Sequence, residues 1–187
     1  MLAIIRLWVL NMILNRLMKV DIAALVVALL ALILTIGQAY VQRLHNHISV
    51  QPRVNAYFTA LADDGGRGIY LVNNGLGSGF VKRIRVSLDG VEVGALSGSG
   101  FVDAVLLMGF DMTCFVIRGP RPNDSFRVGE EIGLIALMPN ARAGCESYSE
   151  RFSREIGKRL TYTISFESIY GDSFEYASVT NTQISTK

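Results

Sequence analysis

An uncharged run of 20 residues near the start of the chain constrains this protein more than any other feature. Ile22 to Val41 reads IAALVVALLALILTIGQAYV and contains no Asp, Glu, Lys or Arg. About 20 apolar residues are what an α-helix needs to cross a bilayer, and a run inside a bilayer must be helical because its backbone finds no water there. Asp21 stands at the N-cap position and Tyr40 at the level of an interfacial aromatic anchor. We therefore predict a transmembrane helix over residues 20–42.

A cleaved signal peptide is the competing interpretation of this run. The apolar core of a signal peptide is shorter, about 7–15 residues, and it needs a cleavage site with small residues. The segment Thr35-Ile36-Gly37-Gln38-Ala39 fits such a site poorly. We therefore favour a retained anchor.

The basic residues that flank the run predict its orientation. Three precede it and two follow it; they are Arg6, Arg16, Lys19, Arg43 and Arg53. Cytoplasmic flanks carry an excess of Lys and Arg. The excess predicts that the N-terminus lies in the cytoplasm and the C-terminal domain on the other side of the membrane. We expect a bacterial inner-membrane protein, for which that side is the periplasm.

Residues 1–19, MLAIIRLWVLNMILNRLMK, predict an amphipathic helix that lies in the membrane interface. On a helical projection the polar residues gather on one side and the Leu and Ile side chains, with Trp8, on the other; the polar residues are Asn11, Asn15, Arg16 and Lys19. The alternative is that translation starts at Met18, which would leave a short cytoplasmic N-terminus.

A stripe of small and polar residues also runs along the predicted span. Its members recur at alternating steps of four and three, so they share one helix face where backbones can approach and a Gln can bond across. We predict that the span associates with a second copy or with another membrane subunit through this stripe, which consists of Ala24, Ala28, Ala31, Thr35 and Gln38.

After the span, the hydrophobic pattern changes to a period of two, which predicts a β-domain over residues 43–180 and a flexible tail over residues 181–187. Asp89-Gly90 is a strong signal for a hairpin turn, and residues 101–110 fit either a short helix or a buried strand. About seven short strands predict a β-sandwich of immunoglobulin-like type. The expected strands are residues 50–58, 67–72, 80–88, 91–93, 132–138, 160–167 and 174–179.

Three segments of the β-domain carry a resemblance to known proteins. They are the stretch from Leu71 through the basic strand to Leu88-Asp89-Gly90, then Val128–Glu131, then Tyr170–Asp172. Together they resemble the immunoglobulin-like adhesion-type domains related to the CARDB family, and bacterial membrane-anchored proteins with "LVNNGLGPA"-like and "YGD"-like segments. Ser78 stands where that pattern has Pro. The resemblance covers about residues 48–180; it implies a fold and an envelope setting, and no catalytic residues.

The glycines at alternate positions in LVNNGLGSG raise the question of a phosphate-binding loop. Such a loop needs a helix after it, whereas Phe80 to Val86 reads as a strand, and the Gly-Lys-Ser/Thr pattern is missing. We expect positive φ angles in a connection between strands. The loop is predicted to bind a partner, as is the segment from Ser97 to Asp103; the loop residues are Asn73, Asn74, Gly75, Gly77 and Gly79.

Few residues suggest chemistry. His45 and His47 would face the same way on a strand, but no third metal ligand is evident. Glu167 and Asp172 flank a turn, and paired carboxylates catalyse glycoside hydrolysis; a solvent-facing residue and a turn former explain them more simply. We predict no metal and no cofactor.

The two cysteines, Cys114 and Cys145, are expected to form a disulfide if the domain lies in an oxidising compartment; two unrelated thiols are the alternative. The net charge of +2 is too small to indicate nucleic-acid binding. We expect a membrane-anchored binding or scaffold module in an envelope assembly, not an enzyme. The alternatives are an envelope hydrolase that uses carboxylates, and a sensor that signals through the helix.

Overall fold

The computed structural model describes the backbone of residues 2–59, 67–138 and 142–186, and the side chains from residue 21 onward within these ranges. The chain divides into two compact units, Met1–Asn46 and His47–Lys187. The first unit is helical, and we call the second the β-domain.

One helix, α1, occupies Leu2–Ser49. Within it, the stretch Asp21–Ser49 is long and apolar enough to cross a membrane, a property that anchors and signal sequences share. The predicted span of residues 20–42 lies inside this helix, but the helix does not end there. It continues because residues 42–48 contain no Gly or Pro, and Pro52 disfavours a helical residue before it. The compact unit that contains the sheets begins at His47, within the last turn of α1, and the predicted start of the β-domain is residue 43.

Side chains of the small-residue stripe are exposed along α1. The Oγ1 atom of Thr35 donates to the carbonyl oxygen of Ala31 over 2.8 Å, so this hydroxyl is occupied within the helix. Association through the stripe stays a prediction, as does the amphipathic face of residues 1–19, whose side chains lie outside the described part of the chain.

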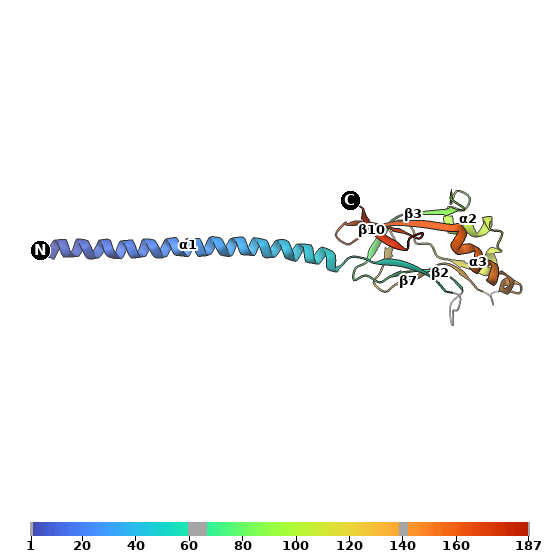
Figure 1. Ribbon diagram of the computed structural model, residues 1–187, viewed down its shortest axis with the longest axis horizontal. Coiled ribbons are helices and arrows are strands. Elements are labelled where there is room, and N and C mark those ends of the chain that lie inside the picture. Colours follow the sequence, from blue (N-terminus) through green and yellow to red (C-terminus); the bar gives the residue numbers. More distant parts are fainter. Residues whose placement is uncertain (1, 60–66, 139–141, 187) are drawn as a thin grey trace. The chain divides into compact units, whose positions relative to one another are not determined.

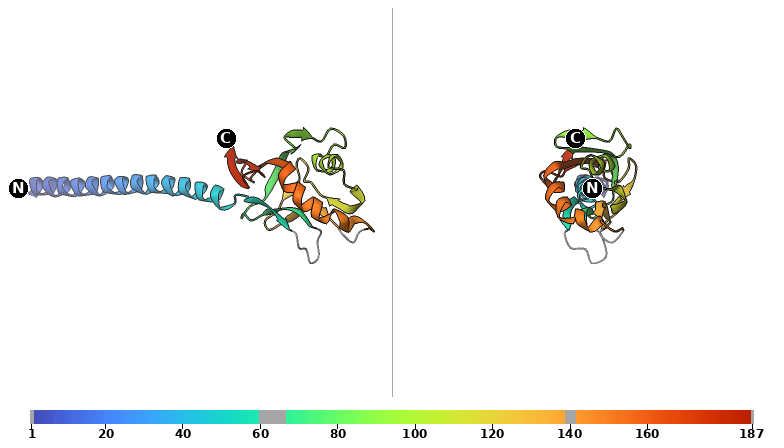
Figure 2. Two further views of the ribbon diagram at one scale, coloured as in Figure 1. Left: turned by 45° about the vertical axis from the view of Figure 1, so that its right-hand side comes forward. Right: turned by 90° about the vertical axis from the view of Figure 1, so that its right-hand side faces the viewer.

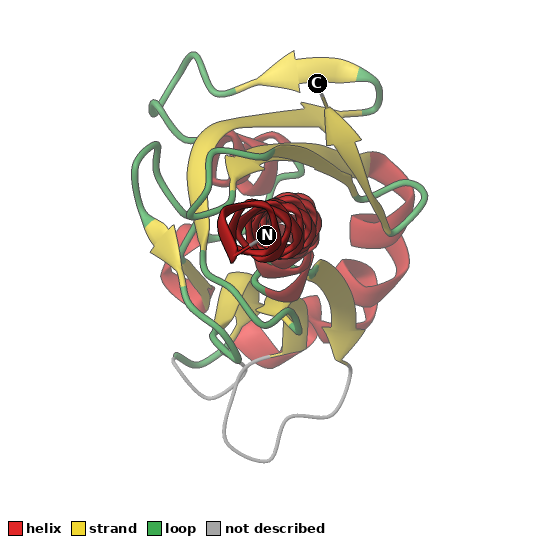
Figure 3. Cartoon of the chain, turned by 90° about the vertical axis from the view of Figure 1, so that its left-hand side faces the viewer, coloured by secondary structure: helices red, strands yellow, loops and turns green. Residues whose placement is uncertain are grey.

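The β-domain contains two antiparallel sheets on opposite sides of one core (Figures 1 and 3). The first sheet has four strands in the order β1-β2-β7-β5, and in the second the path is β10-β9-β8-β3-β4, with β6 paired to β3. The bounds in the first sheet are β1 Val54–Thr59, β2 Arg67–Asn73, β7 Glu131–Leu137 and β5 Phe115–Ile117. Those in the second are β10 Thr182–Thr186, β9 Ser173–Ala177, β8 Leu160–Glu167, β3 Gly79–Leu88, β4 Val91–Val93 and β6 Ser125–Phe126.

Alternation of the side chains explains the core. Along β8, the four buried residues are every second one, as predicted; they are Leu160, Tyr162, Ile164 and Phe166. Val86 and Leu88 of β3 are buried from the same sheet, and Leu71 and Ile135 from the other, so both sheets contribute to one hydrophobic core. The mainly β character and the two antiparallel sheets are confirmed, and the immunoglobulin-like type stays a prediction.

Two short helices complete the β-domain (Figure 2). The ambiguous segment 101–110 forms a helix, α2 Gly100–Leu107, followed by the 3-10 turn η1 Met112–Cys114. The 3-10 turn η2 Cys145–Tyr148 leads into α3 Ser149–Arg159, which the sequence analysis did not predict. α3 buries Phe152 and Ile156 on one face.

The flexible tail expected over residues 181–187 is wrong for residues 182–186. These residues form β10, which pairs with β9 from Thr182 opposite Ala177 to Thr186 opposite Ser173. Asn181, with φ at +50°, makes the turn between the strands, and its side-chain oxygen accepts from the hydroxyl of Tyr176 over 2.8 Å. Because the side chains of β10 are mostly exposed, its sequence shows no alternation of apolar and polar residues that would predict a strand.

Candidate functional site

A groove of about 710 Å³ opens in the β-domain between β3, β4 and two loops. Its floor includes Ile84 and Val86 of β3 and the ring of Phe101 at the start of α2. One wall is the chain from Gly98 to Gly100, and the other is the chain from Gly119 to Pro122. The groove thus includes part of the segment from Ser97 to Asp103 that the sequence predicts as a partner surface.

The groove coincides with a gap in the strand pairing of β3. β6 pairs with Gly79 and Phe80 at one end of this edge, and β4 pairs from Val86 onward at the other. Within the part of the chain that the structure describes, residues 82–85 therefore have no strand neighbour on the side away from β8.

The direction of the backbone groups at this gap follows from the register. Leu88 and Val91 flank the two-residue turn Asp89-Gly90, so their backbone groups face each other across the hairpin. On the other side, the N–H of Asp89 donates to the carbonyl oxygen of Arg159 over 2.8 Å. Because directions alternate along an antiparallel strand, the N–H and C=O of Ile84 point away from β8 and into the gap.

Close packing at two glycines shapes the walls of the groove. A Cβ on Gly100 would lie 2.6 Å from the Cβ of Val86, so only glycine lets α2 begin directly on β3. A Cβ on Gly119 would lie 2.9 Å from the Cδ2 of Phe101. The ring of Phe101 also packs edge-on against Tyr162, with 5.5 Å between the centroids. These contacts fix both walls relative to the sheet.

The buried carboxylate of Asp103 holds the loop in front of α2. It accepts from the N–H of Leu96 over 2.9 Å, and from the N–H and hydroxyl of Ser97 over 2.9 and 2.5 Å. The hydroxyl bond is the main reason that the pKa of Asp103 lies below its ordinary value of 3.8, with the backbone N–H groups adding to it and burial opposing it. This part of the predicted partner segment is therefore structural.

Positive charge prevails at the rim of the groove. Its lining contains Lys82, Arg83 and Arg121 against one carboxylate, Glu92. The Nζ of Lys82 lies 2.9 Å from Glu167, and the Nε of Arg121 lies 3.7 Å from Asp124. Arg83 is exposed and forms no ion pair within the described ranges. The groove therefore presents a cation that an anionic ligand can bind without displacing a carboxylate.

The other predicted partner surface, the loop from Asn73 to Gly79, is largely built into the domain. The side chain of Asn73 is fully buried. Its Nδ2 donates to the carbonyl oxygens of Gly77 and Phe126 over 2.9 and 3.1 Å, and its Oδ1 accepts from the N–H groups of Arg53 and Gly75, each over 3.0 Å. Asn73 therefore joins this loop to two other segments of the chain, and partner binding by the loop stays a prediction.

The predicted reason for the glycines in this loop is wrong. Gly75, Gly77 and Gly79 do not have positive φ angles. A Cβ on Gly75 would overlap the backbone of residues 51–53, and one on Gly77 would overlap the carbonyl oxygen of Val50. The glycines allow the loop to lie directly against the chain that follows α1.

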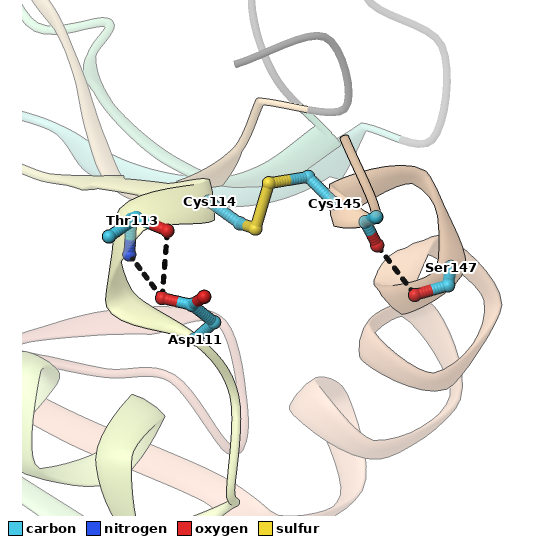
Figure 4. Close-up of a disulfide and its surroundings, with 6 residues drawn as sticks. Asp111, Thr113, Cys114, Cys145 and Ser147 are labelled. Atoms are coloured by element: carbon cyan, nitrogen blue, oxygen red, sulfur yellow. Dashed lines mark hydrogen bonds between the residues drawn. A yellow bond between two sulfur atoms is a disulfide. The ribbon is translucent and has the colours of Figure 1, made fainter. Parts of the chain in front are cut away.

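The structure joins Cys114 and Cys145 in a disulfide, and both residues are buried (Figure 4). η1 carries Cys114 at its end, and Asp111 caps this turn by accepting from the N–H and the hydroxyl of Thr113 over 2.9 and 2.8 Å. The bond connects η1 to η2, so it ties the start of β5 to the segment that leads into α3.

The two histidines do not share a face, because they lie on α1 and not on a strand. Residues at i and i+2 of a helix do not face each other. His47 instead stacks on the ring of Tyr170 with 4.4 Å between centroids, and its Nδ1 lies 3.1 Å from Asp172. Asp172 also accepts from the hydroxyl of Ser168 over 3.1 Å. The Tyr170–Asp172 turn thus holds the first residue of the β-domain.

The carboxylates of Glu167 and Asp172 have different partners. Glu167 pairs with Lys82 and Asp172 with His47. Within the described part of the chain, no group of three or more His, Cys, Asp or Glu side chains is arranged to hold a metal ion.

No protein-family model, no curated protein and no solved structure matches this chain. The resemblance to CARDB-related domains therefore stays a prediction from three sequence segments.

Proposed function

We propose that this protein is a membrane-anchored binding module of a bacterial envelope. α1 is retained as the anchor, the N-terminus lies in the cytoplasm and the β-domain lies in the periplasm. The module is a subunit or accessory protein of a larger membrane assembly. Its groove between β3 and α2 takes an extended segment of a partner protein.

One observation supports this function above all. Among the described residues, 82–85 of β3 lack a strand neighbour on one side, and Lys82 to Ile84 line a groove of about 710 Å³ together with Val86 and Phe101. Peptide-binding domains that add a strand to a sheet obtain affinity from the main chain and specificity from pockets for alternate side chains. The N–H and C=O of Ile84 are available for one such main-chain pair.

The charge of the rim supports an acidic partner segment. Three cations and one carboxylate line the groove, and the guanidinium of Arg83 is not paired within the described ranges. Arg binds carboxylates through two parallel hydrogen bonds, a bidentate geometry that adds specificity to the electrostatic attraction. An extended segment with Asp or Glu beside an apolar residue complements both the cations that line the groove and its apolar floor.

The setting rests on two further observations. The excess of basic residues before the span supports a cytoplasmic N-terminus. The disulfide of Cys114 and Cys145 suits an oxidising compartment such as the periplasm.

Site-specific photocrosslinking in cells tests the groove. Ala95 lines it, whereas Leu96 is exposed and does not. A photoreactive amino acid at position 95 is expected to give an adduct with a discrete partner, and the same residue at position 96 is expected not to. Arg83→Glu is expected to abolish the adduct, and Arg154→Glu, on the exposed face of α3, to leave it intact. Equal adducts from both positions, or an adduct indifferent to Arg83→Glu, would refute groove binding.

A reporter fused after Lys187 tests the setting. A reporter that is active only in the periplasm is expected to be active. Activity from a cytoplasm-only reporter would overturn the orientation.

A further inference from the structure

Four apolar side chains stand exposed on the tips of three loops of the β-domain. They are Leu76, Val128, Ile169 and Tyr170, with exposed fractions between 49% and 75%. Single exposed apolar residues are ordinary on a protein surface. Here they come from three loops that meet at one place in the fold, which calls for a common explanation.

The place where these loops meet is the chain segment 47–53, which comprises the last three residues of α1 and the four residues that follow it. The loop of Leu76 lies directly against Val50: a Cβ on Gly77 would overlap the carbonyl oxygen of Val50. The ring of Tyr170 stacks on His47. The loop of Val128 is tied to the first loop by a bond of 2.8 Å from the N–H of Gly129 to the carbonyl oxygen of Asn73. We call the four side chains the apolar rim.

Two arginines accompany the apolar rim. The N–H of Arg53 donates to the side chain of Asn73 over 3.0 Å, so this residue lies beside the loop of Leu76, and Arg127 directly precedes Val128. Both side chains are exposed, and neither forms an ion pair within the described ranges. Exposed apolar tips with neighbouring cations are what an anionic lipid surface attracts.

The length of the connection limits how far the rim can lie from a bilayer that holds α1. His47 follows Val41, the end of the uncharged run, by six residues. These residues are helical, which corresponds to a rise of about 9 Å, and even a fully extended chain would reach only about 20 Å.

We propose that the apolar rim inserts into the headgroup region of the membrane and seats the β-domain on the lipid surface. This proposal rests on the retention of α1 as an anchor, which is part of the proposed function. Tyr170 suits such a position because its ring is apolar and its hydroxyl is polar. α2, which borders the groove, lies at the end of the β-domain away from the start of β1 (Figures 1 and 2), so a seated domain leaves this side of the groove open to partners.

Tryptophan fluorescence of the full chain in lipid vesicles tests the proposal. Trp8 is the single tryptophan, so Trp8→Phe provides a silent background. Leu76→Trp places the probe on the rim, and Leu96→Trp is the matched control, because both leucines are 75% exposed and Leu96 lies on the loop before α2. Each variant is reconstituted in vesicles of phosphatidylethanolamine and phosphatidylglycerol, with and without brominated acyl chains.

The expected result is blue-shifted emission and strong bromine quenching at position 76, and neither at position 96. Combining Leu76→Trp with Arg53→Glu and Arg127→Glu is expected to reduce the quenching. Solvent-like, unquenched emission at position 76 in protein that floats with the vesicles would refute insertion of the apolar rim and would leave the anchor unaffected. Blue-shifted emission without quenching would refute it in favour of a protein cover. Failure of the protein to float would refute the anchor and the rim together.

Discussion

Asn73→Ala is expected to destabilise the β-domain severely, because Asn73, the last residue of β2, anchors the loop that follows it. The buried amide makes four hydrogen bonds to backbone groups of three segments. A buried hydrogen bond contributes about 1 kcal/mol net, so losing four costs about 4 kcal/mol. That is a large share of the stability of an ordinary domain, and it corresponds to a fall in Tm of about 10–15 °C.

Asn73→Asp tests the hydrogen bonds that the side chain donates separately from those that it accepts, because a carboxylate keeps the acceptor and removes the donor. The introduced carboxylate can still accept from the N–H groups of Arg53 and Gly75, but it faces the carbonyl oxygens of Gly77 and Phe126. Burial and these oxygens raise its pKa in the folded state above that in the unfolded state. The loss of stability is therefore full above the folded pKa, and it shrinks as pH falls toward the unfolded pKa of about 3.9.

Urea denaturation of the full chain in detergent, followed by far-UV circular dichroism, measures both variants. Asn74→Ala is the matched control, because its side chain is exposed on the same loop. If Asn73→Ala costs no more than Asn74→Ala, or if Asn73→Asp does not recover on acidification, Asn73 is not the structural link described above.

Three further changes have defined outcomes. Ala28→Leu is expected to weaken association of the span in a membrane two-hybrid assay by forcing the helices apart, whereas Leu29→Ala, on another face, is expected to matter less. If both variants associate like the wild type, the stripe consists of ordinary lipid-facing alanines. Peptide mass mapping without reduction should link Cys114 to Cys145, and replacing both by Ala should cost about 3–4 kcal/mol for a separation of 31 residues; free thiols in the native protein would contradict this. Asp103→Asn is expected to destabilise the domain at pH 7, and the deficit should shrink as pH falls below 3.8 through the lowered pKa of Asp103; a deficit equal at pH 3 and pH 7 would show that its ionised form contributes nothing.

Strands with one buried face could be predicted from the sequence, and elements without one could not. β8 alternates strictly, and β3 alternates on both sides of a bulge between Val81 and Arg83. The Asp89-Gly90 turn has the positive φ angles, +52° and +84°, that this dipeptide favours. β5 and β6 are too short to show a period. The apolar side chains that α3 buries are Phe152 and Ile156. Its Arg151, Glu155 and Arg159 form ion pairs at i,i+4 spacing, and that charge pattern indicates a helix.

The candidate site could be predicted only in fragments. The segment from Ser97 to Asp103 was predicted as a partner surface, and part of it lines the groove. The facing wall, Gly119 to Pro122, and the gap at Ile84 depend on tertiary pairing. The glycines at 75 and 77 signalled a constraint whose cause is the neighbouring chain at residues 50–53. A close approach between distant segments leaves no local pattern that distinguishes it from a turn.

The central strand pair of the larger sheet has a consequence for biosynthesis. Leu88 pairs with Leu160 and Phe80 with Glu167, which are 72 and 87 residues apart. At about 5–20 residues per second, the ribosome needs several seconds to deliver β8 after β3. During that time the apolar face of β3 is uncovered, and such distant pairing closes slowly. If α1 is retained as an anchor, the nascent domain is confined to the membrane surface during this interval. Collisions between incompletely folded copies then depend on how crowded the protein is within the plane of the membrane.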